Sequence, residues 1–334
     1  MRQLLLIGVA SAALLTASGI DGPISGFILD GAVRAIRPVN GMPGSAVQGA
    51  ALPLPFSVGI AAISLRLDFA LVTDAGGDGT PVLALGLRSG APQIAAIDRA
   101  ISAERIVLSE SGDIAALYSN GSARLQFLTG LPGQPQAADP IDISSLNGGV
   151  VALALDVQGR NALVAAGDGG IYWLAGRAAL NRIASVPGAG SAAFLANGSD
   201  VAVGSKTTGD VLLLHDAGGS LSISTLAGAR DGISSAVAVR AINGSEVAVV
   251  DGTGRLAAID VNTSTVAWID LAGAADRLEM LAGGLLVLNS AGPRALLVLD
   301  VSQGRTAYFI PPVRPSRGDT LSPAPGGRRS GVQQ

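Results

Sequence analysis

The chain contains one histidine, His215, which is the first residue to consider for chemistry. It ends the run VLLLH and precedes Asp216, so this pair suggests acid or base catalysis with the carboxylate orienting the imidazole. One histidine excludes sites that need two or three, and the absence of cysteine excludes disulfides and thiolate chemistry. We favour the alternative that His215 is a polar residue beside a turn, and we predict no catalytic residue.

A second candidate is the acidic, glycine-rich segment Asp74–Thr80 (DAGGDGT). Asp74 and Asp78 offer carboxylate oxygens, which Ca²⁺ prefers, but calcium takes about six or more ligands. We therefore favour a plain turn, assign no cofactor or metal site, and keep Ca²⁺ as the alternative.

These residues belong to a repeat. Gly244–Asp260 (GSEVAVVDGTGRLAAID) is typical of a strand, a tight turn and a second strand. Variants of this pair recur along the chain at a mean spacing of about 43 residues, which indicates a β-propeller. An apolar run before each of the last six pairs predicts an inner strand, for example Arg105–Leu108, Val150–Leu155 and Ala236–Val239. A further run after every pair predicts an outer strand, with Val47–Leu54 in the first copy.

The sequence thus predicts an all-β fold with four-stranded antiparallel blades. Seven copies of the pair favour seven blades, and six blades with an irregular N-terminal addition are the alternative. The first copy lacks a clear inner strand, because residues 20–24 are few and polar, so one blade is expected to be three-stranded or composite.

The first strand of most pairs ends in Asp or Asn, whose side chain can accept hydrogen bonds. Equivalent turns of a propeller lie on one face. The residues are Asp30, Asp74, Asn120, Asp168, Asp251 and Asn289, while the fifth copy has Ser205 and Lys206. Together they predict a ring of acceptors that forms a polar binding face for a ligand, cation or partner. We favour the alternative, that Asp and Asn occur here because they form turns well.

Three segments are expected. Residues 1–19 (MRQLLLIGVASAALLTASG) have the basic start, apolar stretch and small residues of an export signal, with an uncleaved anchor as the alternative. Residues 20–313 form the propeller, without a later membrane span. Residues 314–334, which include the tripeptide Arg317–Asp319, are rich in Pro, Gly, Ser and Arg and predict a disordered tail. The protein is therefore expected to be exported, to the periplasm, the cell surface or the medium.

The net charge of the chain limits the classes of partner that it can bind. The formal net charge is -3, and no window before the extreme C-terminus is strongly basic, so nucleic acid is not expected as a partner. We expect a monomer that binds an unknown protein or small ligand.

Ala154–Leu174 (ALDVQGRNALVAAGDGGIYWL) and, more loosely, Leu65–Asp74 (LRLDFALVTD) resemble the YVTN, NHL and WD40-like group of secreted bacterial propellers. The resemblance covers about residues 24–312 and lacks the Gly-His and Trp-Asp dipeptides of true WD40 blades. It implies the architecture and leaves function open, because propellers include enzymes, binders and scaffolds. The favoured function is a non-enzymatic binding or scaffolding module. The alternatives are a lactonase-like hydrolase with a carboxylate-bound metal and a structural module of the cell envelope.

Overall fold

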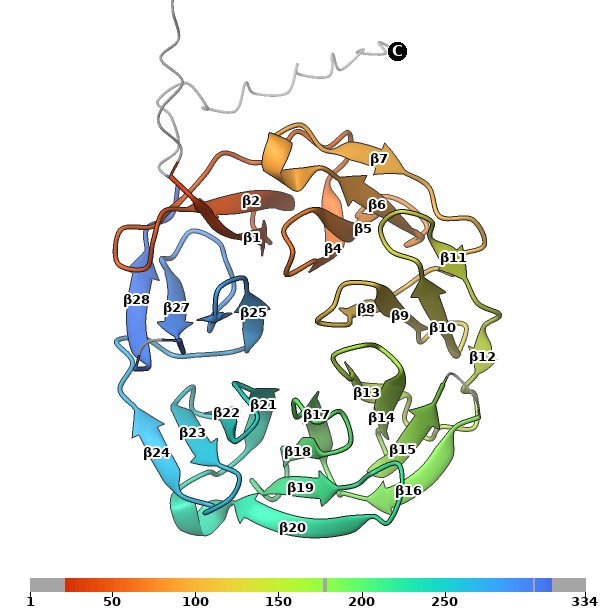
Figure 1. Ribbon diagram of the computed structural model, residues 1–334, viewed down its shortest axis with the longest axis vertical. Helices are drawn as coiled ribbons and strands as arrows, with labels where there is room; N and C mark the ends of the chain where they lie inside the picture. Colours follow the sequence, from red (N-terminus) through yellow and green to blue (C-terminus); the bar gives the residue numbers. More distant parts are fainter. Residues whose placement is uncertain (1–21, 177–178, 303, 314–334) are drawn as a thin grey trace, which may run out of the picture.

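The fold is a seven-bladed, all-β propeller, as the repeat predicted. The computed structural model describes residues 22–176, 179–302 and 304–313, and these form seven antiparallel sheets around a central channel (Figure 1). The predicted export signal and the predicted tail, with Arg317–Asp319, lie outside the described residues. No helix among the described residues is long and apolar enough to cross a membrane.

Strands follow one another in chain order from the channel to the rim of each blade. The inner strands are β4 (Val58–Ile63), β8 (Arg105–Leu108), β13 (Val150–Leu155), β17 (Ala189–Phe194), β21 (Ala236–Ala241) and β25 (Glu279–Leu281). The second strands are β1 (Ile24–Asp30), β5 (Phe69–Asp74), β9 (Ile114–Ser119), β14 (Asn161–Ala166), β18 (Val201–Ser205), β22 (Glu246–Asp251) and β26 (Leu285–Val287).

Third and outer strands complete the blades. The third strands are β2 (Ala35–Asn40), β6 (Pro81–Leu85), β10 (Arg124–Thr129), β15 (Gly170–Ala175), β19 (Val211–His215), β23 (Leu256–Asp260) and β27 (Leu296–Asp300). The outer strands are β3 (Val47–Gln48), β7 (Gln93–Ala95), β11 (Gln136–Ala137), β12 (Ile141–Asp142), β16 (Asn181–Ser185), β20 (Ser222–Ala227), β24 (Val266–Ile269) and β28 (Thr306–Ile310). In the third blade, β11 and β12 both pair with β10. Two short 3₁₀ turns, η1 (Leu87–Ser89) and η2 (Ala229–Asp231), lie near the rim.

The first blade has three strands in the described part of the chain, in the order β1-β2-β3. Strand β1 ends at Asp30, and the second strands of most other blades also end at or beside a hydrogen-bond acceptor of this kind. β1 therefore corresponds to a second strand, and the described part of this blade has no inner strand. The ring closes where this blade packs on the seventh, through side chains such as Ile28 and Val39 against Leu281 and Val298. One parallel bridge, Asp30 to Ala291, adds a main-chain link. Closure thus relies on side-chain packing of the three-stranded first blade against the four-stranded seventh blade, with this one main-chain bridge.

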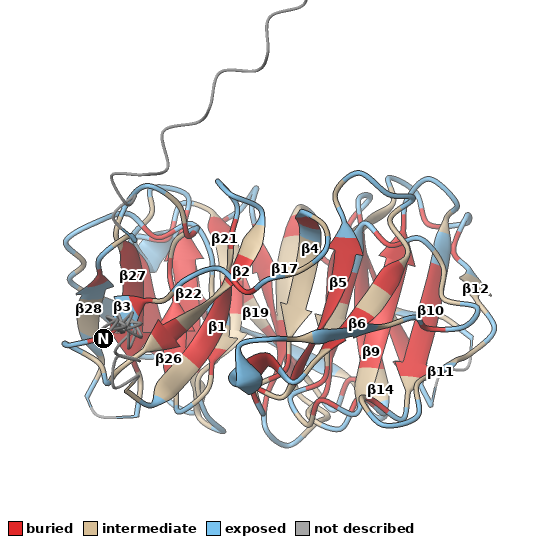
Figure 2. Cartoon of the chain, turned by 90° about the horizontal axis from the view of Figure 1, so that it is seen from above, coloured by how far each residue is buried: buried red, intermediate tan, exposed pale blue. Residues whose placement is uncertain are grey.

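The hydrophobic core is divided into seven layers, each between two adjacent blades. The second and third strands are buried on both faces, so they read as continuous apolar runs such as FALVT in β5. Figure 2 shows this as buried strands between exposed turns at the two ends. Glycine is required in some of these turns: Gly209 has φ 76°, and a Cβ there would lie 2.3 Å from the Ile233 carbonyl oxygen.

Candidate functional site

The predicted ring of acceptors lies at the end of the second strands, where the chain turns into the third. Because all second strands run in the same direction, these turns share one face of the propeller. Four aspartates use the same contact there, in which a side-chain oxygen accepts the main-chain N–H two residues later. The four are Asp30, Asp74, Asp168 and Asp251, with N···O distances of 2.9–3.0 Å. This contact caps the turn and is the reason that Asp suits the position.

Two of these aspartates are buried and paired with arginine. Asp30 accepts Arg37 Nε at 2.8 Å, and Asp251 accepts Arg255 Nε at 3.0 Å and Nη2 at 2.8 Å. Arg255 also stacks on the Trp268 ring, with its guanidinium carbon 3.9 Å from the ring centroid. Burial raises the pKa of Asp251, but hydrogen bonds from Thr253 and Arg255 outweigh it and hold that pKa below its usual value. These two carboxylates are therefore engaged within their own blades.

The remaining members differ from the aspartates. Asn120 accepts the Tyr118 hydroxyl at 2.7 Å, and Asn289 accepts the Leu297 N–H at 2.6 Å. In the fifth blade, Ser205 is buried and donates to the Pro187 carbonyl at 2.7 Å. The six predicted residues thus share a face, and their side chains make local hydrogen bonds in or beside their turns. A binding role for that face stays a prediction.

The acidic turn after β5 carries two separate turn contacts. Asp74 accepts the Gly76 N–H at 2.9 Å, and Asp78 accepts the Thr80 N–H at 2.8 Å. The contacts with Thr80 lower the pKa of Asp78. Across the described residues, no group of three His, Asp or Glu side chains comes together as a metal site would require. The plain turn explains the local geometry.

His215 lies on β19 and has a different carboxylate partner from the one the sequence suggested. Its Nδ1 is 3.3 Å from Oδ2 of Asp200, and its Nε2 is 3.3 Å from the Ser224 hydroxyl. Asp216 instead turns away with φ 44°, and its carboxylate accepts the Ser220 N–H. The alternative in which Asp216 orients the imidazole is therefore not what the structure has, because adjacent residues at a strand end point in different directions. This polar chain lies at the outer part of the fifth blade, away from the channel.

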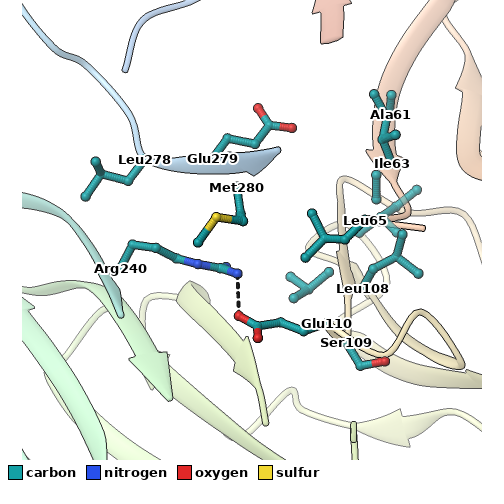
Figure 3. Close-up of a pocket in the computed structure, with 13 residues that line it drawn as sticks. Ala61, Ile63, Leu65, Leu108, Ser109, Glu110, Arg240, Leu278, Glu279 and Met280 are labelled. Carbon is teal, nitrogen blue, oxygen red and sulfur yellow. Dashed lines mark hydrogen bonds and ion pairs between the residues drawn. The ribbon is translucent and has the colours of Figure 1, made fainter. Parts of the chain in front are cut away.

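The central channel holds a site that the sequence did not reveal. A cavity of about 260 Å³ opens between inner strands β4, β8 and β25. Its lining includes the apolar side chains of Ala61, Ile63, Leu65, Leu108 and Met280, which Figure 3 shows around the cavity, together with polar surface of at least the same extent. Cavities in which apolar side chains lie beside a few convergent charged groups are typical of ligand sites.

An ion pair crosses this channel. Arg240, the penultimate residue of β21, donates from Nη2 to Oε1 of Glu110 at 2.7 Å (Figure 3). Glu110 follows β8, so the contact joins the sixth blade to the third, on the opposite side of the ring (Figure 1). A smaller cavity of about 70 Å³ is lined by both residues of the pair, and a second of about 70 Å³ is lined by Glu110.

Glu279 is the third charged group of the cavity and the first residue of β25. The channel walls partly desolvate its carboxylate and raise its pKa, while Arg277 and Arg240 oppose that rise. Its charge contact is Arg277 Nη1 at 4.0 Å from Oε2, and Arg277 itself lies 3.2 Å from Asp276. The side chain remains 46 % exposed, so the carboxylate is open to whatever enters the channel.

These three residues occupy different positions of the repeat, which is why alignment of the copies did not find them. Glu110 lies in a turn, Arg240 near the end of a strand, and Glu279 at the start of one. The available signal was a charged residue beside an apolar inner-strand run, as in AVAVRA of β21.

No protein-family model matches the sequence, and no curated protein matches it. Solved structures do share the fold. A virginiamycin B lyase from Staphylococcus aureus is 10% identical with a TM-score of 0.57, over 76% of this chain and 83% of that one. A functionally unknown protein from Desulfotomaculum acetoxidans is 13% identical with a TM-score of 0.58, over 86% and 99%. Apo AztD from Citrobacter koseri is 15% identical with a TM-score of 0.56, over 86% and 82%. At these identities the likeness shows the fold alone: this chain is a β-propeller.

Proposed function

We propose that the protein is an exported, non-enzymatic binding propeller whose ligand is a small molecule held in the central channel. The observation that carries the proposal is the 260 Å³ cavity, in which aliphatic side chains lie beside the charged residues Glu110, Arg240 and Glu279. The predicted export signal at residues 1–19 supports the location outside the cytoplasm.

The charged groups explain why binding is favoured over a purely structural role. A charged side chain in a partly desolvated channel lowers stability unless it is paired. Arg240 and Glu110 satisfy each other at 2.7 Å, whereas the one ion pair of Glu279 among the described residues is 4.0 Å long. Such a loosely paired group in a cavity indicates a site that is completed by a ligand.

A hydrolase with a carboxylate-bound metal has less support. Its mechanism needs several carboxylates or histidines that converge on one ion. The cavity contains two carboxylates, of which Glu110 is paired with Arg240 at 2.7 Å, and among the described residues no set of three His, Asp or Glu side chains comes together. The lyase of similar fold does not change this view, because an identity of 10% shows the architecture alone.

A cavity-filling substitution tests the proposal. A library of small molecules is screened for thermal stabilisation of the purified propeller and of Ala61→Leu, which fills the cavity from β4. Ala267→Leu adds the same volume on the exposed outer strand β24 and serves as the control. We expect ligands that stabilise the wild type and Ala267→Leu but not Ala61→Leu. Ligands that stabilise all three proteins equally would contradict binding in the channel.

Export is tested separately. The full chain is expressed in a bacterial host, and the N-terminus of the protein in each cell fraction is determined by mass spectrometry. We expect a mature chain that begins close to residue 20 outside the cytoplasm. An intact chain confined to the cytoplasm would contradict this part of the proposal.

A further inference from the structure

We infer that the ligand of the central channel is an organic cation, a protonated amine with an apolar body, whose ammonium group pairs with Glu279. The inference rests on the proposed function, and it adds the charge and shape of the ligand. It follows from three features of the cavity: the balance of charge, the position of the carboxylate and the nature of the walls.

Charge comes first. Of the three charged residues that line the cavity, Arg240 and Glu110 neutralise each other through a 2.7 Å contact. Glu279 is the more loosely paired member, because Arg277 lies 4.0 Å from its carboxylate and Arg240 acts on it while paired with Glu110. Arg277 is also shared, since its Nε is 3.2 Å from Asp276 and its Nη2 donates to Ser290 at 2.5 Å. The cavity therefore offers an acceptor for a cation more readily than a donor for an anion.

Position supports the same conclusion. In Figure 3 the Glu279 carboxylate points away from the Arg240–Glu110 pair, and the Glu279 side chain is 46 % exposed. A cation can therefore approach it without breaking that pair. Partial desolvation by the channel walls raises the pKa of Glu279, and a bound ammonium group would relieve that cost by a charge-assisted hydrogen bond.

The walls define the rest of the ligand. Ile63, Leu65, Leu108 and Met280 present aliphatic surface in the same cavity. An alkyl chain attached to the ammonium group would bury its apolar surface against them. A simple inorganic cation would leave these walls without a partner.

Three probes with one body and different heads test the inference: hexylammonium, hexanoate and 1-hexanol. Each is titrated by calorimetry at pH 8, which favours the ionised carboxylate while the alkylamine stays protonated. The proteins are the wild type, Glu279→Gln and Asp139→Asn. The last removes an equal charge from a side chain that is 88% exposed and paired with Arg99, outside the cavity.

We expect hexylammonium to bind the wild type and Asp139→Asn alike, at least about tenfold more tightly than the other two probes. Glu279→Gln should weaken hexylammonium about tenfold and leave hexanol unchanged. Equal binding to Glu279→Gln, or no binding of hexylammonium to any of the proteins, would overturn the inference.

The outcomes also separate the inference from the proposed function. If hexanoate binds most tightly and Ala61→Leu abolishes its binding, the channel is a ligand site but the cation is wrong. If the library screen yields no ligand whose effect depends on Ala61, the proposed function fails and the inference fails with it. A hexylammonium affinity that Ala61→Leu leaves unchanged would place the amine outside the cavity and would overturn the inference alone.

Discussion

Replacing Asp251 by alanine is the most informative test of how the turns of this propeller are stabilised. The Asp251 side chain is fully buried and accepts five hydrogen bonds. Three come from the turn, namely from the Thr253 N–H, the Thr253 hydroxyl and the Arg255 N–H, and two come from the Arg255 guanidinium. Asp168 occupies the equivalent turn of the fourth blade, is exposed, and accepts the Gly170 N–H. The two residues form a natural pair of perturbation and control.

The expected magnitudes follow from those contacts. A net hydrogen bond contributes about 1 kcal/mol, and one to a charged group about 1.5–3 kcal/mol. Arg255 is 53 % exposed, so water can replace much of its lost contact, and it keeps its bond to the Gly232 carbonyl and its stacking on Trp268. We therefore expect Asp251→Ala to cost about 3–4 kcal/mol, carried mainly by the turn, and Asp168→Ala to cost about 1 kcal/mol.

Urea unfolding followed by circular dichroism measures the difference. With a denaturant dependence of about 3 kcal/mol per molar urea, the Asp251→Ala midpoint should fall by about 1 M and the Asp168→Ala midpoint by about 0.3 M. The pKa of Asp251 is lowered in the folded protein, so its contribution is present above the ordinary carboxyl pKa and is lost as pH falls through the folded value. The gap between wild type and Asp251→Ala should therefore narrow at pH 3. Equal losses for the two substitutions at pH 7 would refute the reasoning.

Two further predictions concern the channel and the turns. Glu279→Gln should stabilise the free protein at pH 7 by less than about 1 kcal/mol, because the side chain is 46 % exposed, and should have no effect near pH 4. The sign follows from the raised pKa, since the cost of the ionised group appears only as pH rises through it; a destabilised variant at pH 7 would contradict it. Gly209→Ala should lower the melting temperature well beyond Gly90→Ala, because both have positive φ but only Gly209 has a carbonyl where the Cβ would lie. Similar losses in differential scanning calorimetry would show that backbone strain alone decides the cost.

The architecture could be predicted because each copy of the repeat carries the same local signals. An apolar run that ends in an acceptor and a glycine-rich turn defines the second and third strands, as in β22 and β23 around Asp251. The inner strands β8 and β13 were predicted with the observed bounds. The outer strand of the first blade was predicted over Val47–Leu54 but spans only Val47–Gln48, because the remaining residues make separate main-chain contacts such as Leu52 to Ile36.

The channel site could not be predicted in the same way, because it depends on which blades face one another. Glu110 and Arg240 are 130 residues apart and lie at different positions of their blades. Their contact follows from the radius and closure of the ring, to which no local signal refers. The predicted inner strand also ended at Val239, which left Arg240 out of the channel wall, whereas β21 continues to Ala241.

The incomplete first blade connects the closure of the ring with the candidate site. In the described part of the chain this blade begins with its second strand, β1. The inner strands on either side of the missing position are β25 and β4, and the same two strands form walls of the 260 Å³ cavity, through Leu278–Met280 and Ala61–Ile63. A complete inner strand between them would occupy space on that side of the channel and narrow the approach to Glu279. In the described part of the chain the first and seventh blades meet without that strand, and the position between β25 and β4 lies beside Glu279.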